Sequence, residues 1–305
     1  MRNSKERSQS FKPIGRLASI GMLILSGILL ASDTSSRADT IFVSNSGNNT
    51  IQQFSPGGAG SLFANLGLNS PYGLALDKTD NLYAANFGNN TIEKFTPGGA
   101  ASLFANSGMS SPSGLAFDSL GNLFVANFGN NSILKFTPGG IGSVFATGLF
   151  SPIGLAVDSS DNLFVSNFGN NTIRKFTPAG VGSTFASTGL SRPVGLAFDI
   201  AGNLYAANSL NNTIEAFTPG GVGSVFANSG LNKPYGLAFD QSGNLYAANN
   251  GNNTIEIFTP GGAGSLFANT GLNFPTFISI VPEPGTWAIL GCGLATLLLF
   301  RRLRA

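Results

Sequence analysis

Hydrophobic positions recur along residues 40–280 in runs of four to seven residues, separated by clusters of Gly, Pro, Asn and Asp. Short apolar runs bounded by such residues are typical of β-strands joined by turns. Four kinds of run follow one another in a fixed order, and the whole pattern repeats about every 41 residues, which leaves no room for a helix. The central part of the chain therefore consists of one structural unit written several times.

The four runs have recognisable sequences. The first is Pro-x-Gly-Leu-Ala-x-Asp, and the second is Asn-Leu-Tyr/Phe-Ala/Val-Ala/Ser-Asn. The third is Asn-Asn-Thr/Ser-Ile-x-x-Phe, and the fourth is Ser-x-Phe-Ala. The first run has a degenerate copy at Pro275 and five regular copies, which begin at Pro71, Pro112, Pro152, Pro193 and Pro234. Six copies of each run indicate six units.

The apolar residues of single strands fall on both sides of the predicted sheets. In the third run Ile92 and Phe95 lie three positions apart, and successive residues of a strand point to opposite faces. In the fourth run Leu103 and Phe104 are adjacent, so we expect each of them to cover a different face as well. Sheets that are stacked face to face in a ring bury both faces, and the alanines of the second run suit the narrow centre of such a ring. An all-β, six-bladed β-propeller with four strands per blade is therefore expected, with an open β-solenoid as the alternative.

The order of the runs at the two ends of the array indicates how the ring closes. The array opens with a second run at Thr40–Asn45 and ends with a first run at Pro275–Ile280. The first unit therefore lacks an inner strand, and the end of the array supplies one. Pairing these two segments would complete six blades of four strands and remove open sheet edges.

Residues 1–38 read as a secretory signal peptide. Several basic residues precede an apolar stretch at 17–31, and the small residues around Ala38 suit cleavage after that position. The stretch is short for a membrane-spanning helix, which is the alternative. We therefore expect signal peptidase to process the chain, and residues 39–280 to form the exported propeller domain.

Residues 281–305 contain a Pro-Glu-Pro motif, an apolar run at 287–300 and terminal arginines. This order resembles the PEP-CTERM sorting signal of bacterial exosortase substrates, and a plain C-terminal anchor is the alternative. The resemblance implies a transmembrane helix with its basic end in the cytoplasm and cleavage by exosortase near the motif in a Gram-negative bacterium that makes extracellular polysaccharide. The sorting residues are Pro282, Glu283, Pro284, Arg301 and Arg302.

The repeated unit resembles the NHL repeat and its propeller relatives across residues 40–280. Two departures stand out: Asn86 and its equivalents stand where the family usually has an acid, and Thr or Ser often replaces an Arg before the isoleucine of the third run. The basic residues by which some NHL propellers bind RNA are therefore missing. Residues 39–280 also contain 7 Lys/Arg against 11 Asp/Glu, so we expect no nucleic-acid partner.

The resemblance also extends to gluconolactonase-type and streptogramin-lyase-type propellers, which are metal-dependent or histidine-dependent enzymes. The chain has no His, and its one Cys, Cys292, lies in the apolar tail, so imidazole and thiol chemistry are absent from the propeller. One Asp ends the first run of five units, where it is suited to cap the following turn, and a ring of Ca²⁺ ligands is the alternative. These residues are Asp77, Asp118, Asp158, Asp199 and Asp240. We expect no catalytic or metal residue and no cofactor.

Candidate binding residues lie between the second and third runs. Asn86, Asn89, Asn90 and their equivalents are expected to line one rim, either as a row of amides for sugar hydroxyls or as residues that satisfy turn backbones. The residue after the first of these asparagines is Phe in three consecutive units, an aromatic arc that would cover half of one face or pack over its own blades. The candidate rim is Phe87, Phe128, Phe168, Asn89, Asn130 and Asn170.

The sequence therefore predicts a non-catalytic exported protein of the cell surface or extracellular matrix. Its propeller would bind extracellular polysaccharide or a surface protein, and its tail would hold it in the membrane until exosortase acts. The alternative is a metal-dependent, lactonase- or lyase-like propeller enzyme.

Overall fold

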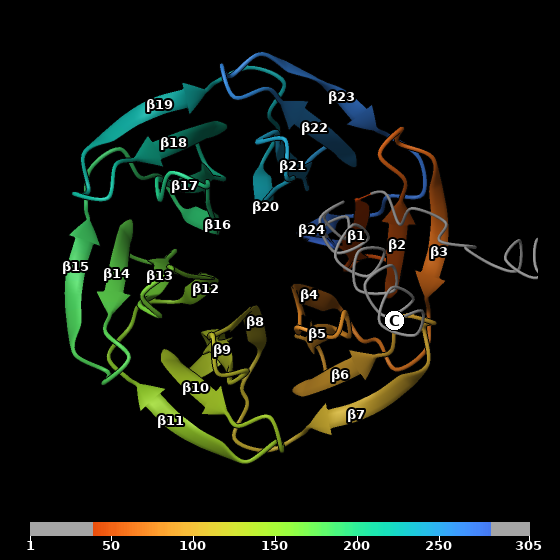
Figure 1. The fold of residues 1–305 in the computed structure, drawn as a ribbon, viewed down its shortest axis with the longest axis vertical. Helices are drawn as coiled ribbons and strands as arrows, with labels where there is room; N and C mark the ends of the chain where they lie inside the picture. Colours follow the sequence, from red (N-terminus) through yellow and green to blue (C-terminus); the bar gives the residue numbers. More distant parts are fainter. Residues whose placement is uncertain (1–38, 282–305) are drawn as a thin grey trace, which may run out of the picture. The chain divides into compact units, whose positions relative to one another are not determined.

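A computed structural model of the 305-residue chain describes residues 39–281. These residues form six four-stranded antiparallel sheets that surround a central axis as the blades of a propeller (Figure 1). Within this range no helix is long and apolar enough to cross a membrane. The predicted signal peptide at 1–38 and the predicted sorting residues from Pro282 onward lie outside the described residues.

The strands occupy equivalent positions in every blade. From the axis outward, blade 1 contains β24, β1, β2 and β3, and blades 2 to 6 follow in chain order from β4. The innermost strands are β4 (Pro71–Leu76), β8 (Pro112–Phe117), β12 (Pro152–Val157), β16 (Pro193–Phe198), β20 (Pro234–Phe239) and β24 (Pro275–Val281). The second strands are β1 (Thr40–Asn45), β5 (Leu82–Asn86), β9 (Leu123–Asn127), β13 (Leu163–Asn167), β17 (Leu204–Asn208) and β21 (Leu245–Asn249).

The two outer positions of each blade repeat in the same way. The third strands are β2 (Thr50–Phe54), β6 (Thr91–Phe95), β10 (Ser132–Phe136), β14 (Thr172–Phe176), β18 (Thr213–Phe217) and β22 (Thr254–Phe258). The outermost strands are β3 (Gly60–Ala64), β7 (Ala101–Ala105), β11 (Gly142–Ala146), β15 (Gly182–Ala186), β19 (Gly223–Ala227) and β23 (Gly264–Ala268). One 3₁₀ turn, η1 (Phe128–Asn130), lies between β9 and β10. The predicted fold of six blades with four strands each is confirmed.

Blade 1 is built from both ends of the repeat array. β24 pairs antiparallel with β1, with Thr40 opposite Val281 and Asn45 opposite Pro275. The Ser44 and Thr276 hydroxyls lie 2.8 Å apart in the buried junction, and both hydroxyls contact the carbonyl oxygen of Tyr72 in blade 2. The predicted strand exchange is confirmed, and its buried hydroxyls also connect blade 1 to blade 2.

The innermost strands of adjacent blades approach backbone to backbone. A Cβ atom added to Gly73 would lie 2.1 Å from the Ser113 carbonyl oxygen, and one added to Gly154 would lie 1.9 Å from that of Val194. Glycine at this position of blades 2 to 6 is therefore required by space at the centre of the ring, whereas blade 1 has Phe277 there. In the next strand outward Ala84 and Ala85 are fully buried, as expected where blades converge.

Apolar residues fill the spaces between blades. Phe95 packs in the core between blades 1 and 2, whereas Ile92 of the same strand packs in the core between blades 2 and 3, as predicted. The prediction that Leu103 covers a buried face is wrong, because its side chain is 55% exposed. The blades splay apart toward the periphery (Figure 1), and the first three residues of every outermost strand are exposed for this reason.

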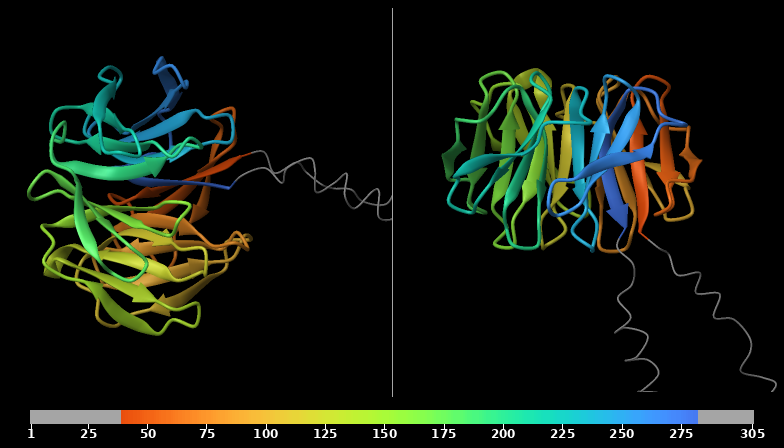
Figure 2. Two further views of the ribbon diagram at one scale, coloured as in Figure 1. Left: turned by 60° about the vertical axis from the view of Figure 1, so that its left-hand side comes forward. Right: turned by 90° about the horizontal axis from the view of Figure 1, so that it is seen from above.

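The propeller has two faces with different loops. The Phe87 face carries the loops that join second to third strands and the loops that join each blade to the next. The Asp77 face carries the loops that join first to second and third to fourth strands. Because Thr40 pairs with Val281, both ends of the described chain lie at the Asp77 face (Figure 2, right).

Candidate binding face

The three candidate phenylalanines all lie on the Phe87 face, each directly after a second strand and half-buried. The Phe87 ring stacks on Tyr72 with centroids 4.7 Å apart, and it lies 5.8 Å from Phe128. Phe128, Phe168, Tyr72 and Tyr235 pack against a buried group that includes Ile153. The arc is therefore neither a free rim nor a core: each ring has one side packed and part of its surface open to solvent.

Tyr72 and Tyr235 belong to this cluster although the repeat pattern provided no reason to include them. Each is the second residue of an innermost strand, at a point where the pairing register shifts by one residue between Pro71 and Leu74 and between Pro234 and Leu237. Burial, and to a smaller extent the nearby Tyr235, raises the pKa of Tyr72 above its usual value. Both phenols are neutral at ordinary pH. We call Tyr72, Phe87, Phe128, Phe168 and Tyr235 the aromatic cluster.

A cation adjoins the aromatic cluster. The Arg192 guanidinium lies over the Phe168 ring, 5.3 Å from its centroid, and the Arg192 side chain is exposed. Burial raises the pKa of Tyr235, and the positive charge of Arg192 acts in the opposite direction. A ligand at this point would therefore meet aromatic rings and a guanidinium together.

Two neighbouring positions in each blade share the space at this face. The residue before the first-run proline accepts a backbone hydrogen bond from the residue after the second strand, as Ser70 does from Phe87. In blades 2 to 4 the residue before the proline is Ser and the residue after the second strand is Phe. In blades 5, 6 and 1 the larger side chain instead precedes the proline or its equivalent. These pairs are Arg192 with Ser209, Lys233 with Asn250, and Phe274 with Ser46. The face is thereby divided into an aromatic half and a half with two exposed cations.

Charge is segregated between the two faces. Among the described loops of the Phe87 face, Arg192 and Lys233 are the charged residues, and both are positive. The described loops of the Asp77 face carry seven aspartates and one lysine, Lys78. The loops of the two faces therefore carry charge of opposite sign, but strand residues offset part of it. Glu93, Glu215 and Glu256 lie against glycines of the Phe87-face loops, and Lys94, Lys135 and Lys175 lie near aspartates of the Asp77 face.

The prediction that Asn86 and its equivalents line a rim is wrong. Asn86 is fully buried, its amide donates to Gly67 and Thr91, and its carbonyl accepts from the Asn69 N–H. Asn90 adopts φ 62° and accepts a 2.7 Å hydrogen bond from the Ser111 N–H of the next blade. These asparagines join blades, because a buried backbone group needs a partner that a turn cannot supply by itself.

The remaining predicted asparagines are exposed. The side-chain oxygens of Asn89, Asn130 and Asn170 each accept a hydrogen bond from the hydroxyl two residues later. Their amide groups lie on the Phe87 face in the same three blades as the phenylalanines. Together with the aromatic cluster they offer donors beside apolar rings.

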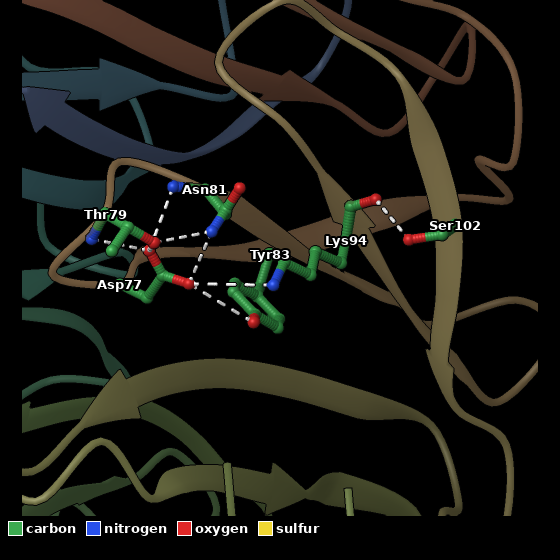
Figure 3. Close-up of polar contacts among 6 residues, drawn as sticks. All are labelled: Asp77, Thr79, Asn81, Tyr83, Lys94 and Ser102. Carbon is green, nitrogen blue, oxygen red and sulfur yellow. Dashed lines mark hydrogen bonds and ion pairs between the residues drawn. The ribbon is translucent and has the colours of Figure 1, made fainter. Parts of the chain in front are cut away.

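The aspartates at the ends of the innermost strands cap turns, as expected. Asp77 Oδ1 accepts from the N–H groups of Thr79 and Asn81 at 2.9 and 3.0 Å, and Oδ2 accepts from the Asn81 amide at 2.8 Å (Figure 3). Burial tends to raise the pKa of Asp77, but the hydrogen bonds from Asn81 and Thr79 outweigh it and hold this pKa below its usual value. Within residues 39–281 no group of three or more Cys, Asp or Glu side chains is placed to hold a metal ion.

Comparisons with known proteins identify the repeat and show that the fold occurs in other proteins. The NHL repeat matches residues 109–136 and 151–176, which lie in blades 3 and 4. Among curated proteins, none matches this chain in sequence. The propeller in a crystal structure of a nidogen/laminin complex is similar, with a TM-score of 0.73 and 21% identity over 80% of this chain and 98% of that one.

Two enzymes have similar folds. A catalytically inactive variant of virginiamycin B lyase from Staphylococcus aureus, solved with quinupristin, gives a TM-score of 0.62 and 17% identity over 82% of this chain and 94% of that one. A gluconolactonase from Xanthomonas campestris gives 0.57 and 19% over 64% and 75%. At these identities the likeness extends to the fold alone. The chain contains NHL repeats, and its described residues, 39–281, form an all-β, six-bladed β-propeller.

Proposed function

We propose that this protein is a non-catalytic, exported binding module whose Phe87 face recognises an acidic polysaccharide. The observation that carries the proposal is the aromatic cluster with Arg192 of blade 5 beside it, where the loops depart from the repeat. Six equivalent loops cannot give specificity by themselves, so a ligand site on this face requires such a departure. Aromatic rings offer apolar area with little loss of side-chain entropy on binding, and their faces suit the C–H side of a sugar.

The charges favour an anionic ligand. Arg192 lies in blade 5, next to the aromatic half, and Lys233 lies in blade 6, one blade further round the ring. The described loops of this face contain no acid. A uronic-acid polymer combines the two chemistries, since each sugar ring can stack while its carboxylate pairs with a cation. A surface protein with an acidic patch is the other outcome that the experiments below separate.

Two features support a binding role over a catalytic one. The chain has no histidine, so a histidine general base is not available. The turn aspartates are committed to backbone N–H groups, as in Asp77 and Asp118. A metal-dependent lactonase- or lyase-like activity is the alternative, and hydrolysis of a lactone by the purified protein would favour it.

Replacement of Phe87, Phe128 and Phe168 together by Ser is expected to weaken binding of the full-length chain to an acidic polysaccharide such as polygalacturonate by at least about tenfold. The reason is that three ring faces are lost while Ser already occupies the same position in blades 1 and 5. Isothermal calorimetry or affinity electrophoresis measures the change. Ile200→Ser, an exposed apolar residue of the Asp77 face, serves as the control that leaves binding unchanged.

Further variants separate the components of this site. Arg192→Ser and Lys233→Ser should weaken binding and reduce its dependence on salt, because exposed ion pairs are screened by added ions. If the phenylalanine variant keeps its thermal midpoint and its affinity for every glycan on an array, the Phe87 face is not a glycan site. Retained binding to an acidic protein would then assign the face to a protein partner.

We further propose that signal peptidase removes residues 1–38 and that exosortase cleaves near Pro282–Glu283–Pro284, which leaves the propeller at the cell surface or in the matrix. The support is the order of export signal, Pro-Glu-Pro, apolar run and terminal arginines, including Arg301 and Arg302. Mass spectrometry of the mature protein should find an N-terminus at Asp39 and a C-terminus near Pro284. A mature chain that retains residues 287–305 would instead indicate a permanent anchor.

A further inference from the structure

Besides the turn groups that they cap, the aspartates that end the innermost strands contact one more side chain, and this side chain is of two kinds. In blades 3 and 4 the partner is a lysine of the third strand: Lys135 lies 3.2 Å from Asp118, and Lys175 lies 3.7 Å from Asp158. In blades 5 and 6 the partner is a phenol: Tyr205 donates to Asp199 at 3.4 Å and Tyr246 donates to Asp240 at 3.3 Å. In these four blades one lysine or one phenol therefore suffices as the additional partner of the aspartate carboxylate.

Blade 2 has both donors. Tyr83 donates to Asp77 Oδ2 at 3.4 Å, and the Lys94 ammonium lies 3.9 Å from the same oxygen (Figure 3). This ion pair is longer than either of those in blades 3 and 4, where no phenol is present. Lys94 is therefore not needed to satisfy Asp77, and its ammonium has N–H donors left for another acceptor.

This surplus cation lines a cavity of about 320 Å³ between blades 2 and 3. The walls include Tyr83, Phe104 and Phe117, and both phenylalanine rings stand edge-on to Tyr83 with centroids 5.0 Å apart. Lys94 lies over the Tyr83 ring at 5.4 Å, and Leu120 and Pro138 complete the apolar lining. The volume is at the lower end of the range for small-molecule sites, which is roughly 300–1,000 Å³.

The charges of the cavity select the ligand. Asp77 is ionised and already accepts from Thr79, Asn81 and Tyr83, so it offers little to a cationic ligand unless Lys94 is displaced. Lys94, with Lys78 also among the lining residues, gives the cavity one positive charge more than it has negative charges. An anionic group can bind Lys94 while a planar or chair-shaped ring fills the space between the aromatic walls.

We propose that this cavity binds a six-membered ring that bears one carboxylate, such as a sugar acid or an aromatic acid. The site lies on the Asp77 side of the propeller and is independent of the Phe87 face. Its ligand enters between two blades, and recognition consists of ring contact with Phe104 and Phe117 and a charge-assisted hydrogen bond from Lys94.

The chain itself supplies a matched control. Between blades 5 and 6, Tyr205 is placed edge-on to Phe226 and Phe239 at 5.0 and 4.9 Å and donates to Asp199, as Tyr83 does to Asp77. In strand pairing, however, Ala216 stands opposite Tyr205 where Lys94 stands opposite Tyr83. The rings between blades 5 and 6 therefore reproduce the aromatic arrangement without the lysine.

The test titrates the full-length chain with benzoate, D-glucuronate and glucose and follows binding by saturation-transfer NMR. We expect saturable binding of a carboxylate with a Kd on the order of 1 mM and none of glucose. Lys94→Ala should weaken this binding at least about tenfold and leave the fold intact, because blade 5 has Ala at this position. The two carboxylates then distinguish a sugar acid from an aromatic acid.

Two further variants complete the test. Lys135→Ala should leave carboxylate binding unchanged but lower the thermal midpoint more than Lys94→Ala, since Asp118 has no phenol to replace its lysine. Ala216→Lys should add a second carboxylate site between blades 5 and 6. Equal carboxylate binding by the Lys94→Ala variant, or loss of this binding on replacement of Phe87, Phe128 and Phe168 instead, would overturn the proposal.

Discussion

Deletion of residues 275–281 from the full-length chain should abolish the cooperatively folded monomer. These residues form β24, the innermost strand of blade 1, and they pair with β1 along its whole length. The deletion removes the burial of Phe277, Ile278 and Val281, worth roughly 1.5–3 kcal/mol for each side chain. The sum approaches the total stability of a typical protein, about 5–15 kcal/mol, before any lost hydrogen bond is counted.

The deletion also leaves β1 with an unpaired edge toward the axis. The neighbouring innermost strands β4 and β20, which belong to other sheets, would each lose a packing neighbour. We expect size-exclusion chromatography to show aggregates or exchanged oligomers, and circular dichroism to show no sharp thermal transition. Phe277→Gly, which restores the residue of the other five blades, is the control and should keep the transition. An unchanged midpoint after the deletion would mean that β24 does not close the ring.

A single added methyl group at the centre of the ring should have the second large effect. Gly154→Ala places a Cβ atom 1.9 Å from the Val194 carbonyl oxygen and 3.0 Å from Ser166 Oγ. Because the first of these contacts is to backbone of the next blade, no side-chain rotation relieves it. We expect the free energy of unfolding to fall by about 3 kcal/mol, at the upper end of the usual cost of overpacking.

Chemical denaturation measures this loss, and the repeat provides its control. Gly139 lies in a turn of the Asp77 face, where an added Cβ would be 3.9 Å from the nearest atom, the Thr137 hydroxyl. Gly139→Ala should therefore change stability by no more than about 1 kcal/mol, and in the stabilising direction if the turn accepts it. Equal stability of the two variants would show that adjacent inner strands can move apart at little cost.

The repeat pattern predicted the fold because strand order and register are local properties of the sequence. The segments at Thr40–Asn45 and Pro275–Ile280 were identifiable as partners since each lacked the neighbour that its equivalents possess. The split of Ile92 and Phe95 between two cores followed from the two-residue period of a strand. Burial at the periphery was overestimated at Leu103, because the period gives the direction of a side chain but not the distance to the next blade.

The aromatic cluster and the cavity between blades 2 and 3 could be predicted only in part. Phe87, Phe128 and Phe168 stood out as departures from the repeat, whereas Tyr72 and Tyr235 lie at a register shift where the alternation of faces fails. Asn86 is buried because it bonds to the loop from the preceding blade, a contact that no local pattern encodes. The surplus donor at Lys94 emerges only when the second and third strands of six blades are compared in space.

The course of β24 determines how the propeller would respond to mechanical load. Thr40 and Val281 are paired at one end of the β1–β24 ladder. Tension between them therefore separates the residue pairs of β1 and β24 one after another, starting from that end. Tension between Val281 and a ligand held on the Phe87 face acts along the axis of β24 instead. In that direction every hydrogen bond between β24 and β1 is sheared at once, and the strand that closes the ring is at its strongest.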